Sequence, residues 1–598
     1  MPKLIIDDIT VEVAEGVTVL EAAQSVDIPI PHFCWHPALG KAGACRVCAV
    51  KLLDGPIKGI QMSCMLPAQD GMVVSTVDPE AVAMRQQVIE WLMINHPHDC
   101  PVCDEGGQCQ LQDYTIACGH GLRRYDGKKR THLNQDLGPN IEHEMNRCIQ
   151  CYRCARFYQE FAGGTDFGVM GSASRVYFGR FEDGELQSPF SGNLVDICPT
   201  GVFTDKTARF RARYWDFDMA PSICPECSLG CNTTPVARYR ELLKISARHN
   251  DAVNGWFICD RGRFADKKVN SFDRPRVPLV NGSSSGWGDA VDAVAKKAAE
   301  FAPGSIAVVA SSRLANEGAA LLPDLARALS GAKLCFFSNE VICRASITAA
   351  SQITPHMAAS LDDVASADCI VIYECDLRQE APMMLLAVRQ AWRKGAPVFL
   401  VGKGAPLEQA AAVSVEAVDL DIIVEAPIGI FDRPVIIFST MRSSAAEIKN
   451  LMAAEAKFAP LFDGPNGMGM AKLAAANSTI SLESAVKSGL IKGIITIECV
   501  IADELRGEIP IIAALDWQMN SSVKNAGVFL PTTAWVEMNG TFVNNEGRAQ
   551  QFKKVMAPGI PVSATLESGH PPRIHSLDVP GGEPKPAWEV ITEIMKRL

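Results

Sequence analysis

The chain has 598 residues, of which 47% are hydrophobic and 21% charged, and its formal net charge is −11. Because single hydrophobic cores stop growing near about 250–300 residues, this length predicts several domains. The acidic balance argues against nucleic-acid binding, which needs a basic surface, and no apolar run approaches the roughly 18–20 residues of a membrane span, so we expect a soluble or peripheral protein.

The 21 cysteines do not form the pattern of a disulfide framework. They cluster in C-x-x-C groups, which suit metal sites, and the chain is far larger than the small secreted domains that disulfides stabilise. The N-terminal residues lack the charged start and apolar run of a secretory signal. We therefore expect a reducing compartment.

The first eighty residues predict a small ferredoxin-like module. Lys3–Ile6 and Thr10–Val13 alternate around an Asp7–Asp8 turn, which indicates a hairpin, and Thr18 with Glu21 forms a capping box that opens a short helix. A Gly- and Ala-rich loop follows, as close wrapping around a cluster requires. The first ligand set is Cys34, Cys45, Cys48 and Cys64, with a first gap longer than in plant-type ferredoxins. We predict a two-iron cluster, with a four-cysteine zinc site as the alternative.

A helix is expected from Pro79, with Asp78 as its N-cap, to about His96, because the residue before Pro97 is disfavoured in helices. The second ligand set follows from this helix end: His96, Cys100, Cys103 and Cys109. A histidine ligand changes the net charge of a cluster and with it the potential. His98 competes with His96 on spacing alone, and Cys₃His zinc is the alternative.

The third set is Cys148, Cys151, Cys154 and the remote Cys198, which precedes Pro199 as in bacterial ferredoxins. No second matching run lies nearby, so Cys198 is expected to complete a four-iron set with the other three. The fourth set is Cys224, Cys227, Cys231 and Cys259, for which zinc is again the alternative. No redox role is assigned to the remaining cysteines: Cys118, Cys335, Cys343, Cys369, Cys375 and Cys499.

Asn281–Gly286 is expected to be a linker or turn, and alternating strands and helices follow it. The expected strands are Ile306–Ala310, Cys369–Glu374, Val398–Val401, Val435–Phe438, Gly493–Ile497 and Ile511–Leu515, with helices such as Glu380–Arg393 and Ser443–Ala453 between several of them. This alternation predicts a parallel α/β sheet. No Walker A sequence and no convincing G-x-G-x-x-G after a strand is found, so no nucleotide site is expected.

The four sets in this order resemble the large iron–sulfur subunit of proton-pumping NADH:quinone oxidoreductase (respiratory complex I). The resemblance includes Asp99–Cys109, Arg147–Cys154 and Cys198–Thr204, and it is strong over about the first 275 residues. It implies His96 rather than His98 as the ligand. It also implies one 2Fe–2S cluster on the first set and 4Fe–4S clusters on the other three.

The resemblance further implies an electron-transfer subunit that relays electrons from FMN in a partner toward quinone and itself holds no NADH, FMN or quinone site. Implied partners are the FMN/NADH-binding flavoprotein subunit, the small 2Fe–2S subunit and the quinone-site subunits, with membrane contact only through partners. The implied location is the cytoplasmic face of the bacterial inner membrane, as a peripheral protein.

From the fourth set onward the chain looks like the molybdopterin-dependent oxidoreductases, and Asn539–Arg548 is similar to a segment of that superfamily. This raises the alternative of a molybdenum-dependent formate dehydrogenase. Against it, Arg344 follows Cys343 where a histidine is expected, Tyr373–Leu377 lacks the expected Gly and Asn-Pro, and the chain ends soon after Arg548. We expect a degenerate scaffold without molybdenum. The iron–sulfur subunit of a soluble NAD-linked formate dehydrogenase or hydrogenase is a further alternative.

The fold expected is therefore multidomain α+β and α/β. A 2Fe–2S ferredoxin-type (β-grasp) domain is expected over 1–79, a His(Cys)₃-ligated 4Fe–4S domain over 80–120 and a 4Fe–4S ferredoxin-like domain over 121–216. A 4Fe–4S domain of the molybdopterin-enzyme type is expected over 217–273, and a degenerate molybdopterin-oxidoreductase-like α/β domain over 274–598.

Overall fold

The computed structural model describes residues 1–119, 124–337, 339–402, 416–417, 430–477, 479–562, 564, 579 and 581–598. The chain divides into two compact units, residues 1–216 and 217–598. Each unit is described by itself below. Among the described residues, no helix has the length and apolar character needed to span a membrane.

Unit 1 begins with a five-stranded sheet in the order β2-β1-β5-β3-β4. Its elements are β1 (Lys3–Ile6), β2 (Ile9–Glu12), α1 (Val19–Gln24), β3 (Ala49–Asp54), β4 (Gly59–Met62) and β5 (Val73–Ser75). The predicted hairpin is confirmed: β1 and β2 pair antiparallel, and Asp7 and Asp8 turn the chain with φ of 44° and 67°. The capping box at Thr18 and Glu21 is also present. One side of the sheet and α1 enclose an apolar core that includes Leu4, Leu20 and Val50.

The rest of unit 1 consists of the 15-residue helix α2 and shorter elements. They are α2 (Pro79–Met93), α3 (Gln110–Ala117), β6 (Ile141–His143), α4 (Arg153–Ala155), β7 (Phe167–Met170), β8 (Tyr177–Arg180), α5 (Asn193–Ile197) and β9 (Phe203–Asp205), with a π-helix over Arg156–Phe161 and 3₁₀ turns over Cys100–Val102, Met145–Arg147, Ala173–Arg175 and Tyr214–Asp216. The helix α2 starts as predicted, because the Asp78 side chain accepts a hydrogen bond from Glu80 N, but it ends at Met93 rather than near His96.

Unit 2 opens with an antiparallel sheet in which β12 pairs with β10, β11 and β13. Its elements are β10 (Asp218–Met219), β11 (Ser222–Ile223), β12 (Asn232–Arg238), β13 (Glu241–Ala247), α6 (Asp260–Arg263) and α7 (Asp266–Val269). A short hairpin, β26 (Gly540–Val543) and β27 (Ala549–Phe552), comes from much later in the chain, and β27 contacts β11.

Two sheets, not one, form the α/β part of unit 2. The first has the order β15-β14-β25-β24-β23-β16-β17 and contains β14 (Leu279–Val280), β15 (Ser283–Ser284), β16 (Ile306–Ala310), β17 (Lys333–Phe336), β23 (Gly493–Ile497), β24 (Ile511–Asp516) and β25 (Ala526–Pro531). The second has the order β20-β19-β18-β21-β22 and contains β18 (Cys369–Tyr373), β19 (Val398–Val401), β20 (Glu416–Ala417), β21 (Pro434–Ser439) and β22 (Lys457–Leu461).

In the first sheet, the pairs along the order β25-β24-β23-β16-β17 are parallel. All pairs of the second sheet are also parallel, as the alternation predicted. Asn281 and Gly282, with φ of 49° and 80°, form the turn of the β14–β15 hairpin, so the Asn281–Gly286 segment is a turn rather than a linker. The alternation did not distinguish one sheet from two, because the strand order depends on pairings between segments far apart in the chain.

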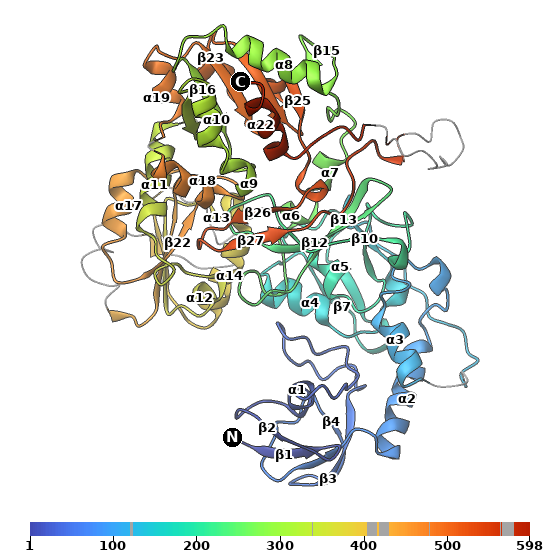
Figure 1. Cartoon of the computed structure of the whole chain (residues 1–598). Helices are drawn as coiled ribbons and strands as arrows, with labels where there is room; N and C mark the ends of the chain where they lie inside the picture. The colour runs from blue at the N-terminus through green and yellow to red at the C-terminus, as the bar shows by residue number, and fades with distance from the viewer. Residues whose placement is uncertain are drawn as a thin grey trace. The chain divides into compact units, whose positions relative to one another are not determined.

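Helices cover both sheets, and Figure 1 shows α8 and α22 beside β25. The longer ones are α8 (Trp287–Ala298), α10 (Leu322–Ala328), α11 (Glu340–Gln352), α14 (Pro382–Arg393), α17 (Ala445–Leu451), α18 (Gly467–Ala476), α19 (Leu482–Lys487) and α22 (Ala587–Met595). The shorter ones are α9 (Asn316–Ala319), α12 (Leu361–Ala365), α13 (Leu377–Glu380), α20 (Asp503–Arg506) and α21 (Ser521–Lys524), with a 3₁₀ turn over Trp535–Glu537.

Candidate iron–sulfur cluster sites

The first ligand set is held by the β3–β4 hairpin and the loop before it. Ala49 pairs with Met62, so Cys48 and Cys64 lie just beyond the paired residues on adjacent strands, and their Sγ atoms are 3.3 Å apart. Cys34 lies next to Cys45 and Cys64, and all four side chains are buried. The contact with Cys64 lowers the pKa of the Cys48 thiol to about 7, whereas contacts with Cys34 and Cys48 raise the pKa of Cys64. Within this pair Cys48 therefore favours the thiolate, which is the form that binds metal.

The second set surrounds one cavity of about 210 Å³. His96, Cys100, Cys103 and Cys109 all line it, together with Leu111, Arg147 and Gly201. His96 follows α2, Cys100 begins a 3₁₀ turn, and Cys109 precedes the first residue of α3. The shared cavity brings together all four residues that the spacing selected.

His96 has the burial and the hydrogen bonding expected of a metal ligand. Its side chain is buried, and its Nδ1 atom has no hydrogen-bond partner within the part of the chain described. Burial, with the nearby Arg147, lowers the pKa of His96 to about 4, so the imidazole is neutral at neutral pH, as a metal ligand must be. His98 is exposed, lies 3.3 Å from the Met93 carbonyl through Nε2, and does not line the cavity.

The third set lines a small cavity of its own, formed by Cys148, Cys151, Cys154 and Cys198 with Phe178 and Phe203. Gln150 and Tyr152 adopt left-handed φ of 54° and 65°, which winds the chain tightly between the three close cysteines. The backbone N–H of Gln150 donates to Cys148 Sγ at 3.3 Å. Such non-glycine conformations cost free energy and persist where a site requires them.

The three sets of unit 1 are neighbours. Cys34, Cys45, Cys109 and Cys151 belong to one buried cluster with Phe33 and Ile149. On the side of the first set, Arg153 donates from Nη2 to the Trp35 carbonyl at 2.9 Å. On the side of the second set, Cys109 Sγ lies 3.8 Å from the Pro199 carbonyl oxygen. The chain segments that carry the third set therefore contact the segments that carry the other two.

The fourth set, Cys224, Cys227, Cys231 and Cys259, is buried in unit 2. The Cys224 N–H donates to the Cys231 carbonyl at 2.8 Å, and a Cβ built at Gly262 would be 2.6 Å from Cys224 Sγ and 4.0 Å from Cys259 Sγ. Burial first, and then the neighbouring thiols, raises the pKa of Cys231. Among the described residues, no three His, Cys, Asp or Glu side chains are placed to hold a single metal ion.

A cavity of about 360 Å³ lies at the carboxyl ends of β16 and β23, where the strand order of the first α/β sheet reverses. This is the place where open α/β sheets bind ligands. Carboxyl groups of Glu226, Asp463 and Glu498 line it. Of the two cationic lining residues, Lys268 is paired with Glu226 at 3.0 Å and Arg313 with Asp516 at 2.6 Å.

This lining does not fit a molybdopterin dinucleotide, whose phosphates are anionic. Both lining cations of the described cavity are already paired with carboxylates, so neither is free to bind a phosphate. Cys343 is buried in α11 and is not among the lining residues.

Two residues that contact the ligand sets were missed in the sequence. Arg147 and Gly201 both lie beside Cys103 of the second set, although they come from the chain segments that carry the third. Arg147 belongs to the motif Arg147–Cys154 and Gly201 to the motif Cys198–Thr204, both quoted for the family resemblance. Their positions close to ligand cysteines could have identified them as candidates.

Family comparisons agree with the arrangement along the chain. The 2Fe–2S iron–sulfur cluster binding domain matches residues 3–79, and the NADH-ubiquinone oxidoreductase-G iron–sulfur binding region matches residues 85–124. The ferredoxin-like domain of NADH-quinone oxidoreductase subunit 3 matches residues 138–204. The molybdopterin oxidoreductase Fe4S4 domain matches 218–271, and the molybdopterin oxidoreductase family matches 283–417 and 466–560. The multidomain fold class and the presence of 2Fe–2S and 4Fe–4S binding domains are thereby confirmed.

Curated relatives align over nearly the whole chain. The G subunit of NADH-quinone oxidoreductase from Pseudomonas putida is 38% identical over 93% of this chain and 70% of its own length. The corresponding protein of Escherichia coli is 37% identical over 96% of this chain and 72% of its own length. Because these alignments include the long C-terminal half, they favour this family over the hydrogenase and formate dehydrogenase alternatives. The chain belongs to the family of NADH-quinone oxidoreductase G subunits, the iron–sulfur electron-transfer subunits of that oxidoreductase complex.

Proposed function

We propose that this chain holds four iron–sulfur clusters and relays electrons within its complex, toward quinone. One 2Fe–2S cluster is assigned to Cys34, Cys45, Cys48 and Cys64. Three 4Fe–4S clusters are assigned to the sets of His96, Cys148 and Cys224, each with the three further cysteines given above. When bound, such clusters supply reversible one-electron redox centres.

The observation that carries the proposal is the grouping of the ligand side chains at buried or half-buried positions. Residues distant in sequence, such as Cys48 with Cys64 and Cys154 with Cys198, come together in these sets. His96 adds a neutral imidazole with an unpartnered nitrogen, within the described part of the chain, to the second set. Buried polar groups without partners are rare, and an absent ligand is one of the accepted reasons for them.

The residues around the ligand sets shield them from water and donate hydrogen bonds to their sulfur atoms. Phe33 and Ile149 pack among the thiols of the three sets in unit 1 and keep water out. The backbone N–H of Gln150 donates to a sulfur of the third set, and such hydrogen bonds help to set potentials. The contact of the segments that carry the third set with those that carry the other two favours electron exchange between neighbours. The fourth set lies in unit 2.

The division into domains over 1–79, 80–120, 121–216, 217–273 and 274–598 is part of the proposal, supported by five family matches in the same order. So is the absence of molybdenum, supported by the pairing of both cations that line the described cavity in unit 2 with carboxylates. As a member of its family, the chain has other subunits of the complex as partners. We propose that these include the flavoprotein, the small 2Fe–2S subunit and the quinone-site subunits, at the cytoplasmic face of the bacterial inner membrane.

Metal analysis of the anaerobically purified complex tests the proposal together with low-temperature EPR of the NADH-reduced state. Iron and acid-labile sulfide in this chain, with EPR signals lost one by one on substitution of each ligand set, are expected. Stoichiometric molybdenum or tungsten would instead support a formate dehydrogenase, and zinc as the main metal would support a non-redox scaffold.

A further inference from the structure

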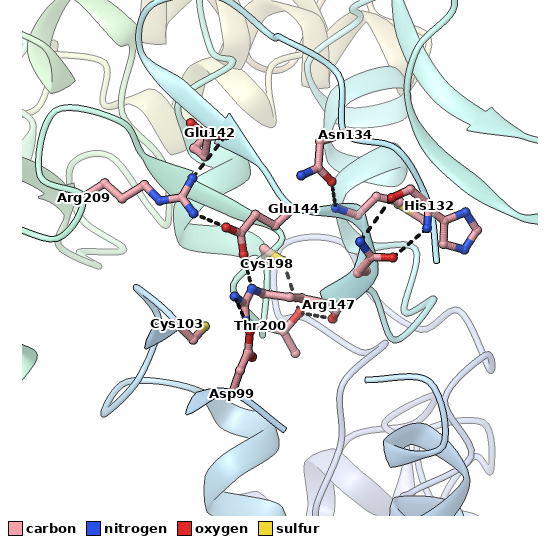
Figure 2. Close-up of polar contacts among 12 residues, drawn as sticks. Asp99, Cys103, His132, Asn134, Glu142, Glu144, Arg147, Cys198, Thr200 and Arg209 are labelled. Carbon is pink, nitrogen blue, oxygen red and sulfur yellow. Dashed lines mark hydrogen bonds and ion pairs between the residues drawn. The ribbon is translucent and has the colours of Figure 1, made fainter. Parts of the chain in front are cut away.

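Arg147 occupies the junction between the second and third ligand sets. It directly precedes Cys148, a member of the third set, yet its side chain lines the cavity of the second set. Its backbone carbonyl accepts a hydrogen bond from Thr200 Oγ1 at 3.1 Å, and the same hydroxyl lies 3.7 Å from Cys198 Sγ (Figure 2). One residue thus contacts segments of both sets.

The guanidinium is buried and held in a fixed orientation. Its Nη1 and Nη2 atoms donate to the two carboxylate oxygens of Asp99 at 2.6 and 3.1 Å, and Nε donates to Glu144 (Figure 2). Glu144 is in turn held by Arg209, which also pairs with Glu142 at 3.1 Å. A bidentate guanidinium–carboxylate pair of this kind fixes both distance and direction.

Arg147 also stands close to the ligands themselves. A Cβ built at Gly201 would be 3.4 Å from Arg147 Cδ and 2.9 Å from Cys103 Sγ, so a single small residue separates them. Among the described residues that line the cavity, Arg147 is the one with a permanent charge, while Asp99 and Glu144 do not line it. Glu105 also lies close by, since its Cβ would be 3.0 Å from the same added atom.

We propose that Arg147 is a positioning residue that sets the reduction potential of the centre bound by His96, Cys100, Cys103 and Cys109, and keeps this set in register with the third. The guanidinium lines the cavity whereas its partners Asp99 and Glu144 do not, so its positive charge acts on an added electron more strongly than their negative charges do. Screening by solvent is weak at such a buried site. The proposal rests on the proposed function, since it requires a cluster in the second set.

The test uses the purified complex and redox titration followed by EPR, with the signal of the second set assigned by its loss in Cys103→Ala. Arg147→Gln should lower the one-electron reduction equilibrium constant about tenfold, a shift of about 59 mV to lower potential. Arg147→Lys, which keeps the charge, should stay within about threefold of wild type. Arg209→Gln is the matched comparison, because Arg209 binds the same Glu144 but does not line the cavity, and it should shift the potential clearly less than Arg147→Gln does.

A second variant distinguishes an effect of the Arg147 charge from structural damage to the cluster site. Asp99→Asn leaves Arg147 less neutralised and should move the potential upward, opposite to Arg147→Gln. If Arg147→Gln does not retain the cluster, the potential measured in Asp99→Asn alone tests the proposal. An unchanged potential in Arg147→Gln with the signal retained, or a shift of Asp99→Asn that is absent or downward, would overturn the inference. Absence of the signal from the wild-type complex would instead refute the proposed function.

Discussion

Gly201 lies against Cys103: a Cβ added at Gly201 would be 2.9 Å from Cys103 Sγ and 3.0 Å from Glu105 Cβ. Gly201 follows the remote cysteine of the third set by three residues, whereas Cys103 belongs to the second. The two sets therefore approach each other as closely as they do because this position carries no side chain.

Gly201→Ala should accordingly displace Cys103 and weaken the EPR signal of the second set, while the signal of the first set is retained. Gly288→Ala is the control, because an added Cβ there meets no atom within 4 Å. Iron content and EPR of the purified complex measure the effect. Equal signals in Gly201→Ala and Gly288→Ala would show that the close contact is not needed.

Cys151→Ala should abolish one reduced four-iron EPR signal and NADH-to-quinone turnover, because the segments that carry the third set contact those that carry both others in unit 1. Reduction of artificial acceptors at the flavin of the partner subunit should remain partly intact. Cys369→Ala, a buried cysteine in β18 outside the four sets, serves as the matched control and should keep all signals. Normal quinone reduction in Cys151→Ala would contradict the relay.

How far the sequence predicts this molecule can be judged from particular elements. β16, β19 and β23 have the bounds expected from their runs of β-branched residues, since a buried parallel strand is read directly from local composition. The ligand sets were chosen from spacing, because close cysteines must share a loop. The existence of two sheets was not predictable, because β23 pairs with β16 across nearly two hundred residues.

The same limit applies to the surroundings of the ligands. Arg147 and Asp99 are separated by 48 residues, and the local sequence around either residue does not predict their ion pair. Spacing alone did not decide between His96 and His98; the family resemblance implied His96, and the fold buries His96 and exposes His98.

A buried ion pair in unit 2 should contribute strongly to stability. Arg274 and Glu537 lie 263 residues apart, and their side chains are 2% and 0% exposed. Removing one partner leaves a buried charge unpaired, so Arg274→Met should destabilise unit 2 by roughly 3–5 kcal/mol. Urea unfolding of the full chain, followed by tryptophan fluorescence, measures this, because Arg274 lies 5.8 Å from the Trp517 ring.

Arg344→Ala is the control for this ion pair, since the Arg344–Glu340 pair lies on the surface of α11 and should matter little. Equal unfolding midpoints for Arg274→Met and Arg344→Ala would refute the role of the buried pair.

The stability of unit 2 should fall as the pH rises from about 4.5 to about 8. Burial raises the pKa of Glu498 from its ordinary value of 4.5 to about 8. Between these values the folded chain keeps the proton and the unfolded chain releases it, so rising pH favours the unfolded state. Glu498→Gln should remove this part of the pH dependence, and the hydroxyl of Thr532 can still donate to the amide oxygen.

Thermal unfolding of wild type and Glu498→Gln at pH 6 and pH 8, followed by circular dichroism, checks this prediction. The melting temperature of the variant minus that of wild type should be larger at pH 8 than at pH 6. A constant difference between the two proteins across this range would show that Glu498 does not stay protonated.

The central claim is that the four clustered ligand sets bind iron and inorganic sulfide. Quantitative iron and acid-labile sulfide analysis of the full chain, prepared anaerobically and reconstituted, tests it most directly. One 2Fe–2S and three 4Fe–4S clusters predict about 14 iron atoms and about 14 sulfides per chain. Correctly folded chain that contains zinc and no acid-labile sulfide would contradict the account.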